Sequence, residues 1–187
     1  MLPTLTDEQM TTLLAQRPKG FVACRLHAVI AFVLDTGVRI DEALTLRVSN
    51  VDYDNLLVTV FGKGRKERRI PFSFELRTVL FRYERVRSVH CPRCELLFPA
   101  RTGTEWEQRN SLRGLHLLED KLGLPRFGWH RLRHTFATNY LRQGGDIVRL
   151  SMVLGHTQIT TTQRYLHLLT EDLSASHQKV SILNRLG

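Results

Sequence analysis

The spacing of apolar residues predicts several helices in the first quarter of the chain. Thr6 and Gln9 lie three residues apart at the start of an apolar-periodic segment, which is the arrangement of a capping box, so a helix is expected to open there. Residues 21–34 form a second apolar segment, and Gly37 then interrupts the pattern. Because the next apolar residues again recur at helical spacing, we expect two helices to meet at this glycine.

After these helices, the spacing of apolar residues changes to the alternation of apolar and polar positions that is typical of β-strands. Three short segments carry this β pattern, RVSNVDY at 47–53, LLVTVF at 56–61 and ERRIPF at 67–72, and they are separated by turn residues at 54–55 and by the sequence GKGRK at 62–66. They predict a small antiparallel three-stranded sheet with Lys63 on its last turn. Helical patterning returns at 74–89 and 110–122. The expected fold class is therefore mainly α with one small antiparallel β-sheet.

Length and charge limit the domain organisation and the choice of partner. The 187 residues, 42% of them hydrophobic, are enough to bury one core, so we expect a single domain. Lys and Arg outnumber Asp and Glu by 27 to 18, and the net charge of +9 favours a polyanion such as nucleic acid. No segment has the apolar length of a bilayer span and the first ten residues hold no signal core, so we expect a cytoplasmic protein without a membrane partner.

Two short segments raise the question of a metal site. His90, Cys91 and Cys94 offer three zinc ligands, but a structural site usually has a second pair and no other cysteine lies nearby, which favours two ordinary thiols. Asp52 and Asp54 leave a metal-dependent nuclease open, although an acidic pair beside a turn is more typical of hairpin capping. We expect no metal site and no cofactor.

A basic segment that begins at Gly128 carries the densest chemistry. His130 and Arg133 are three residues apart, so on a helix beginning near Trp129 they share a face. A zinc hydrolase would place glutamate directly after the first histidine, but Arg131 stands there. This face of the predicted helix is therefore suited to an anion rather than to a metal.

Other reactive side chains precede and follow this segment. Arg39 lies at a predicted helix start, where main-chain N–H groups favour a phosphate, although a surface ion pair with Glu42 fits the sequence too. Lys63 lies between two glycines, which is typical of a solvated turn and also of a mobile lysine. His156 follows a glycine that ends a predicted helix, and a second predicted capping box opens the helix that carries Tyr165.

Taken in order, these motifs resemble the catalytic set of the tyrosine recombinases, the phage-integrase family, and most closely its compact Xer-like bacterial members. The matching segments are TGVRIDEALTL, GKGRKERRIPF, HRLRHTFAT and LGHTQITTTQRY. Each is weak alone, but their order and separations are similar to those of the family, with 24 residues from Arg39 to Lys63 and nine from His156 to Tyr165. The resemblance covers nearly the whole chain and implies the tyrosine recombinase catalytic-domain fold.

The resemblance also implies an activity, namely cleavage and rejoining of double-stranded DNA through a 3′-phosphotyrosyl intermediate, without metal or ATP. It implies a homo-oligomer on DNA, a tetramer in the synaptic complex, in a bacterial, archaeal or phage setting. The residues that it assigns are the catalytic Arg39, Lys63, His130, Arg133, His156 and Tyr165, the supporting Glu42, and the DNA-binding Arg65, Lys66 and Arg131.

The domain organisation implied by the family is a single catalytic domain over 1–187. Its core would be 1–170, and 171–187 would form a tail helix that docks on a neighbouring protomer or, alternatively, packs on its own domain. Family members usually carry an N-terminal core-binding domain, and we expect that domain to be absent because the sequence starts where the catalytic domain normally does.

Two other functions of the same residues stay open. Type IB topoisomerases use a similar cationic set and a tyrosine, but the hairpin lysine, the LGH motif and the short spacing to Tyr165 favour the Xer-like reading. A DNA-binding module without catalysis is the second alternative, and it would leave the full set of reactive side chains unexplained.

Overall fold

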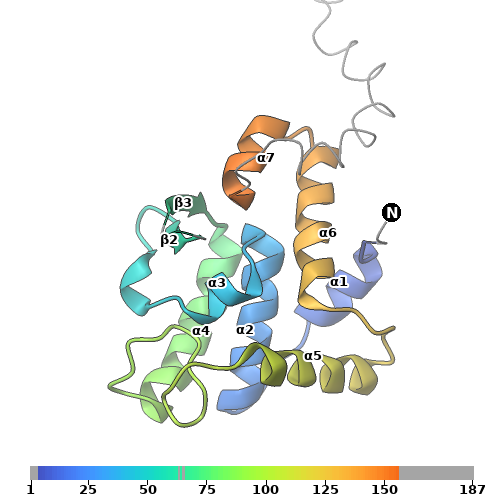
Figure 1. Ribbon diagram of the computed structural model, residues 1–187. Helices are drawn as coiled ribbons and strands as arrows, with labels where there is room; N and C mark the ends of the chain where they lie inside the picture. Colours follow the sequence, from blue (N-terminus) through green and yellow to red (C-terminus); the bar gives the residue numbers. More distant parts are fainter. Residues whose placement is uncertain (1–3, 63, 65, 156–187) are drawn as a thin grey trace, which may run out of the picture. The chain divides into compact units, whose positions relative to one another are not determined.

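Figure 1 shows a computed structural model of the protein, in which residues 4–62, 64 and 66–155 are described. The chain divides into two compact units, Met1–Phe136 and Ala137–Gly187. The boundary between them falls inside helix α6 (Trp129–Arg142). Among the described residues, no helix combines the length and the apolar character needed to cross a membrane.

Helix α2 (Phe21–Thr36) is the centre of the first unit. It packs against the four other complete helices of the unit, which are α1 (Asp7–Leu14), α3 (Ile40–Leu44), α4 (Phe74–His90) and α5 (Gln108–Leu122) (Figure 1). Its side chains Val29, Ile30, Phe32 and Val33 are fully buried. The apolar run at 28–34 within α2 is thus explained by neighbours on several sides of the helix.

Local sequence signals fix where the first helices begin and end. Thr6 and Gln9 form the expected capping box at the start of α1. Gly37 ends α2 with a left-handed φ of 66°, and its N–H donates to the carbonyl of Val33 at 3.0 Å. Both predictions are confirmed.

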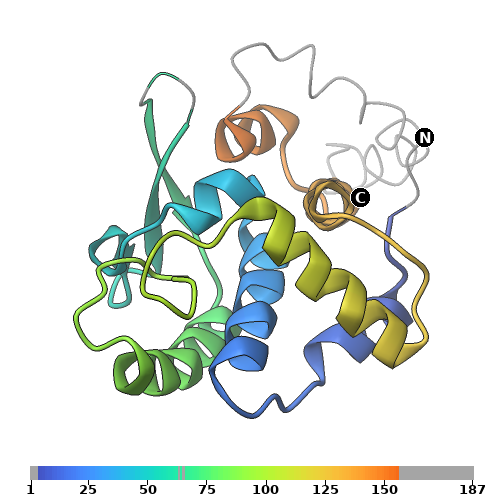
Figure 2. The ribbon, with the colours of Figure 1, turned by 60° about the horizontal axis from the view of Figure 1, so that its bottom comes forward.

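The sheet has three antiparallel strands in the order β1 (Val51–Asp52), β2 (Leu57–Phe61) and β3 (Glu67–Pro71), and Figure 2 shows β2 and β3 as a long hairpin. Val58 pairs with Ile70 and Val60 pairs with Arg68, so these four side chains share the inward face of the sheet. The predicted mainly α fold with a small three-stranded sheet is confirmed. The first strand is shorter than its pattern suggests, because 48–50 forms the 3₁₀ turn η1 (Val48–Asn50).

A buried arginine that sequence reasoning missed ties a long loop to α2. The Arg25 guanidinium lies 3.7 Å from the centre of the Trp106 ring and 5.1 Å from that of Phe21. It also donates a hydrogen bond to the carbonyl of Pro99. Burial lowers the pKa of Arg25 to about 10, which still leaves it charged at neutral pH.

In the second unit, α7 (Ile147–Leu154) is capped at both ends. Asp146 accepts a hydrogen bond from the N–H of Arg149 at 2.8 Å, and Gly155 ends the helix with a φ of 65°. The helix expected here is confirmed. The capping box predicted before Tyr165 and the tail helix predicted at 171–187 lie outside the described residues.

Candidate active site

The junction between α2 and α3 positions Arg39. Gly37 is required there, because a Cβ atom added to it would lie 2.2 Å from the ring of Phe136 on α6. Two residues later Arg39 is the N-cap of α3, and its main-chain N–H donates to Oε2 of Glu42 at 2.9 Å. The Arg39 side chain is 39% exposed, so its guanidinium remains accessible to a ligand.

The buried carboxylate of Glu42 joins α3 to the sheet. Arg68 Nη1 and Nη2 donate to Glu42 Oε1 and Oε2 at 2.9 and 2.7 Å, which is a bidentate pair. Arg39 Nη1 lies 3.3 Å from the same Oε1. Burial alone would raise the pKa of Glu42, but the hydrogen bonds from Arg68 and the Arg39 main chain, with the charges of both guanidinium groups, hold this pKa below its ordinary value. Glu42 is therefore ionised at neutral pH and binds two arginines.

Sequence reasoning assigned Glu42 a supporting role but missed Arg68. The signal for Arg68 was its place in ERRIPF, two residues before the buried Ile70 and so on the same face of the strand. The ion pair between Arg39 and Glu42, weighed from the sequence as an alternative to phosphate binding, is present. It coexists with an exposed guanidinium, so the two interpretations are compatible.

Hydrogen bonds to α5 fix the start of α6. The indole N–H of Trp129 donates to Oγ of Ser111 at 3.1 Å, and the N–H of Phe127 donates to Oε1 of Glu119 at 3.1 Å. Burial raises the pKa of Glu119, whose side chain is fully buried. These contacts fix the start of α6 and therefore the positions from which the side chains of His130 and Arg133 project.

Arg133 reaches the same junction as Arg39. Its Nη1 donates to the carbonyl oxygen of Gly37 at 2.7 Å. The structure thus brings two of the predicted catalytic arginines to one turn of the chain. One turn earlier on α6, His130 is exposed, whereas His134 is buried, so the pair at i and i+4 does not share one environment.

Of the remaining site residues predicted from the sequence, the structure describes two, Lys66 and Arg131. Lys66 is exposed, and its carbonyl accepts the N–H of Gly62 at 2.9 Å across the hairpin turn. Arg131 is half-buried and its Nη2 donates to the carbonyl of Thr4 at 3.5 Å, an internal contact that the sequence did not suggest. The other predicted site residues, Lys63, Arg65, His156 and Tyr165, lie outside the described residues.

The three residues considered for zinc make other contacts. The ring of His90 stacks on Phe21 with centroids 4.2 Å apart, and Sγ of Cys94 donates to the carbonyl of Gly103 at 3.1 Å. Cys91 is buried. Within the described part of the chain, no three His, Cys, Asp or Glu side chains are grouped so that they could hold a metal ion.

The acidic pair considered for a nuclease builds a turn. Asp52 Oδ1 accepts hydrogen bonds from the N–H groups of Asp54 and Asn55 at 3.2 and 3.0 Å, and Oδ2 accepts from the Asn55 amide at 2.8 Å. The amide and these main-chain groups hold the pKa of Asp52 below its ordinary value. Asp52 therefore caps the turn between β1 and β2, which is the role that the sequence favoured for this acidic pair.

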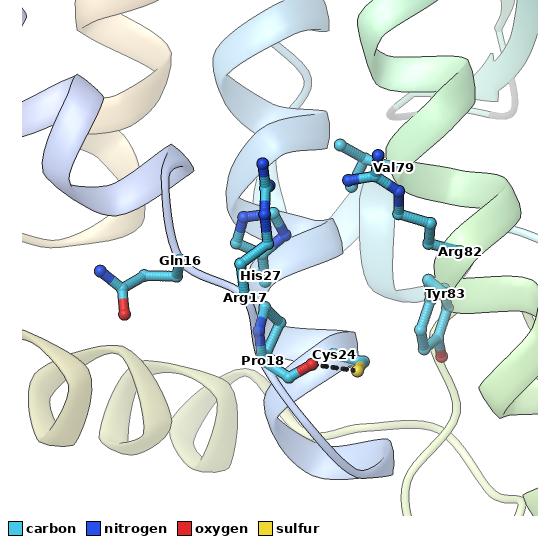
Figure 3. Close-up of a pocket in the computed structure, with 8 residues that line it drawn as sticks. All are labelled: Gln16, Arg17, Pro18, Cys24, His27, Val79, Arg82 and Tyr83. Carbon is cyan, nitrogen blue, oxygen red and sulfur yellow. Dashed lines mark hydrogen bonds between the residues drawn. The ribbon is translucent and has the colours of Figure 1, made fainter.

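A cavity of about 130 Å³ lies among α2, α4 and the segment after α1 (Figure 3). Its lining consists of Gln16, Arg17, Pro18, Cys24, His27, Val79, Arg82 and Tyr83, and it includes none of the predicted site residues. Cys24 donates to the carbonyl of Pro18 at 3.3 Å, and burial raises the pKa of its thiol. A thiol with a raised pKa forms less thiolate at neutral pH, which makes Cys24 a weaker nucleophile.

Comparison of the sequence with known proteins shows the family to which it is similar. The sequence profile of the phage integrase family matches residues 3–172. The tyrosine recombinase XerC of Histophilus somni (strain 2336) is 30% identical over 180 residues, which are 95% of this chain and 61% of the relative. This chain therefore spans about three fifths of the length of that relative.

Two solved structures give the same fold. The crystal structure of XerA recombinase matches with a TM-score of 0.79 and 28% identity, over 97% of this chain and 64% of XerA. The XerH site-specific recombinase bound to difH substrate, in a pre-cleavage complex, matches with a TM-score of 0.75 and 26% identity, over 91% of this chain and 52% of XerH. The fold that the sequence motifs implied is confirmed.

Proposed function

The chain belongs to the phage integrase family, and on that premise we propose that it cleaves and rejoins double-stranded DNA at specific sites through a 3′-phosphotyrosyl intermediate. The observation that carries the proposal is that Arg133 donates to the carbonyl of Gly37, two residues before Arg39, whose partly exposed guanidinium pairs with Glu42. Two guanidinium groups at one turn suit the non-bridging oxygens of a phosphodiester, which they bind with paired hydrogen bonds.

In this mechanism Tyr165 is the nucleophile. Its phenol oxygen forms a bond to the scissile phosphorus while the bond from phosphorus to the 5′ oxygen breaks. The pKa of a free tyrosine is about 10, so the surrounding cations must favour the phenolate. Arg39 and Arg133 stabilise the charge that develops on the phosphoryl oxygens in the transition state.

Three further side chains complete the proton transfers and the phosphate contacts. His156 donates a hydrogen bond to the same phosphate, Lys63 protonates the departing 5′ oxygen, and His130 acts as acid or base beside the tyrosine. One phosphodiester replaces another, so rejoining is the reverse reaction with a 5′ hydroxyl as nucleophile. Neither ATP nor a metal ion is needed.

The DNA duplex is the proposed partner, and a homo-oligomer on DNA, a tetramer in the synaptic complex, is the proposed assembly. The net charge of +9 supports a polyanionic partner. Arg65, Lys66 and Arg131 are proposed to contact duplex phosphates. The related XerH was crystallised with its difH substrate, which supports DNA as the ligand of this fold. A DNA substrate also favours the cytoplasm as the place of action.

The test is the formation of a covalent adduct. The protein is incubated with a pool of short nicked duplexes of random sequence, from which the cleaved end diffuses away, and adducts are separated on a denaturing gel. Tyr165→Phe removes one oxygen and should abolish the adduct while salt-sensitive DNA binding remains. Tyr140→Phe is the matched control and should leave the adduct in place.

Each other outcome points to a different function. An adduct formed by Tyr165→Phe would refute the assignment of the nucleophile. Relaxation of supercoiled DNA without strand exchange would indicate a type IB topoisomerase. Binding to DNA without any adduct would indicate a DNA-binding module.

A further inference from the structure

We propose that Arg68 is a positioning residue for DNA cleavage, which acts through Glu42 to hold Arg39 in the orientation that binds the scissile phosphate. The inference rests on the proposed function, in which Arg39 contacts that phosphate. In this proposal Arg68 does not itself contact the substrate.

The position of Arg68 in the sheet is unusual for an arginine. It lies on the inward face of β3, opposite the fully buried Val60, and its side chain is only 13% exposed. The next residue, Arg69, faces the other way, is 71% exposed, and lies 4.0 Å from Glu67. A charged side chain is buried in this way when it is paired, and Arg68 pairs with the carboxylate of Glu42.

Glu42 needs this second cation if it is to hold Arg39. Its side chain is 7% exposed, and Arg39 alone offers one guanidinium contact at 3.3 Å and one main-chain N–H at 2.9 Å. A carboxylate left with these two contacts would be poorly compensated for its burial. It would then take up a proton or rotate, and in both cases the charge-assisted hydrogen bonds to Arg39 would weaken.

The same ion pair lies under the base of the hairpin turn. A Cβ atom added to Gly62 would lie 3.4 Å from Arg68 Nη1 and 3.6 Å from Glu42 Oε1. Gly62 also closes the turn through its N–H, which donates to the carbonyl of Lys66 at 2.9 Å. Arg68 therefore connects the hairpin to the start of α3. Arg68 and Glu42, which form this connection, are 26 residues apart in the sequence.

The planar fork of arginine is essential to this role. It donates to both carboxylate oxygens at once, whereas a lysine ammonium is a compact charge that cannot match both in the same geometry. Arg68→Lys therefore keeps the charge and loses the orientation. We expect it to slow adduct formation about ten- to a hundred-fold, as small misplacements of catalytic groups do. Duplex binding should stay unchanged at the same salt concentration. Arg69→Lys, the matched control on the same strand, should cleave at the wild-type rate.

A neutral substrate separates positioning from general structural damage. A duplex with a methylphosphonate at the scissile position replaces one charged non-bridging oxygen by a methyl group, so the reaction depends less on a well-placed guanidinium. The ratio of the wild-type rate to the Arg68→Lys rate should therefore be several-fold smaller on this duplex than on the phosphodiester. A structural defect would lower both rates of the variant alike and leave the ratio unchanged.

Failure of the inference and failure of the proposed function give different results. No adduct with wild-type protein on any duplex would refute the proposed function. Wild-type adduct with equal rates for Arg68→Lys and Arg69→Lys, or with a ratio that the methylphosphonate does not change, would overturn the role of Arg68 alone. Thermal melting checks the fold. If Arg68→Lys is unfolded, Arg68→Gln, which still donates one neutral hydrogen bond, replaces it and the same ratio decides.

Discussion

Replacing Gly37 by alanine tests the geometry of the α2–α3 junction. Gly37 has a φ of 66°, a left-handed conformation that costs a residue with a Cβ atom about 1–2 kcal/mol. The added Cβ would also lie 2.2 Å from Cδ1 and 2.5 Å from Cε1 of the Phe136 ring. Both distances are far below van der Waals contact, so the ring or the turn must move. Overpacking of this kind costs about 1–3 kcal/mol.

Together these two effects predict that Gly37→Ala lowers the free energy of unfolding by about 2–5 kcal/mol. For a chain of 187 residues, this corresponds to a drop in Tm of roughly 4–20 °C. The turn also carries the carbonyl that binds Arg133 and leads directly to Arg39. Adduct formation should therefore fall more than the remaining folded fraction explains.

Gly123 provides a matched control. It ends α5 with a φ of 65° and a ψ of 25°, against 66° and 16° for Gly37, and nothing lies within 4 Å of an added Cβ. Gly123→Ala should therefore cost only the conformational term, about 1–2 kcal/mol. Urea unfolding followed by circular dichroism measures both variants. The difference between them isolates the contact with Phe136.

The result that would refute this reasoning is an equal loss in the two variants, within about 0.5 kcal/mol. A double-mutant cycle gives an independent check. If Phe136 is the obstacle, Gly37→Ala and Phe136→Ala together should cost less than the sum of the two single changes, because removing the ring makes room for the new Cβ. If the two losses of stability simply add, the strain in Gly37→Ala does not come from contact with the Phe136 ring.

Three further predictions concern α6 and the role of metals. Burial raises the pKa of Glu119, so the folded state binds this proton more tightly than the unfolded chain, and stability falls as pH rises above the unfolded value of about 4.3. Glu119→Gln keeps an acceptor for the N–H of Phe127 and should match the wild type in acid but be more stable at neutral pH, as urea unfolding at both pH values will show. Trp129→Phe removes the donor to Ser111 and should cost about 1–3 kcal/mol in the same assay. EDTA should leave adduct formation unchanged, because guanidinium groups supply the electrostatic stabilisation in the proposed mechanism; a loss that Mg²⁺ restores would favour a nuclease.

The elements that could be predicted from the sequence are those fixed by local interactions. The capping box of Thr6 and Gln9 and the end of α2 at Gly37 each depend on neighbours within four residues, and each was predicted correctly. The first strand was predicted too long, because a distant segment competes for its backbone. There the N–H of Val48 donates to the carbonyl of Glu95 at 2.8 Å, a pairing that no local pattern reveals.

The candidate site divides in the same way. The resemblance to the family assigned Glu42 a supporting role, and the spacing of one turn suggested only its ion pair with Arg39. Arg68 and Arg25 were missed because their partners come from distant parts of the chain. For Arg68 the alternation of β3 carried a signal, since a charged residue in phase with Ile70 must be paired or exposed. For Arg25, within a helix that is apolar on several sides, the sequence offers no comparable hint of its aromatic partner.

The distribution of charge around Glu42 explains why a third arginine matters. Arg39 and Glu42 alone would neutralise each other, and a neutral pair has little attraction for a phosphodiester. Arg68 compensates the carboxylate with two hydrogen bonds, and Arg133 is anchored by the uncharged carbonyl of Gly37. Three arginines and one glutamate leave two positive charges, which matches the negative charge that accumulates on a phosphoryl group under attack. In the proposed reaction, Arg68 thus lets Glu42 hold Arg39 without cancelling the positive charge that the phosphoryl group would meet.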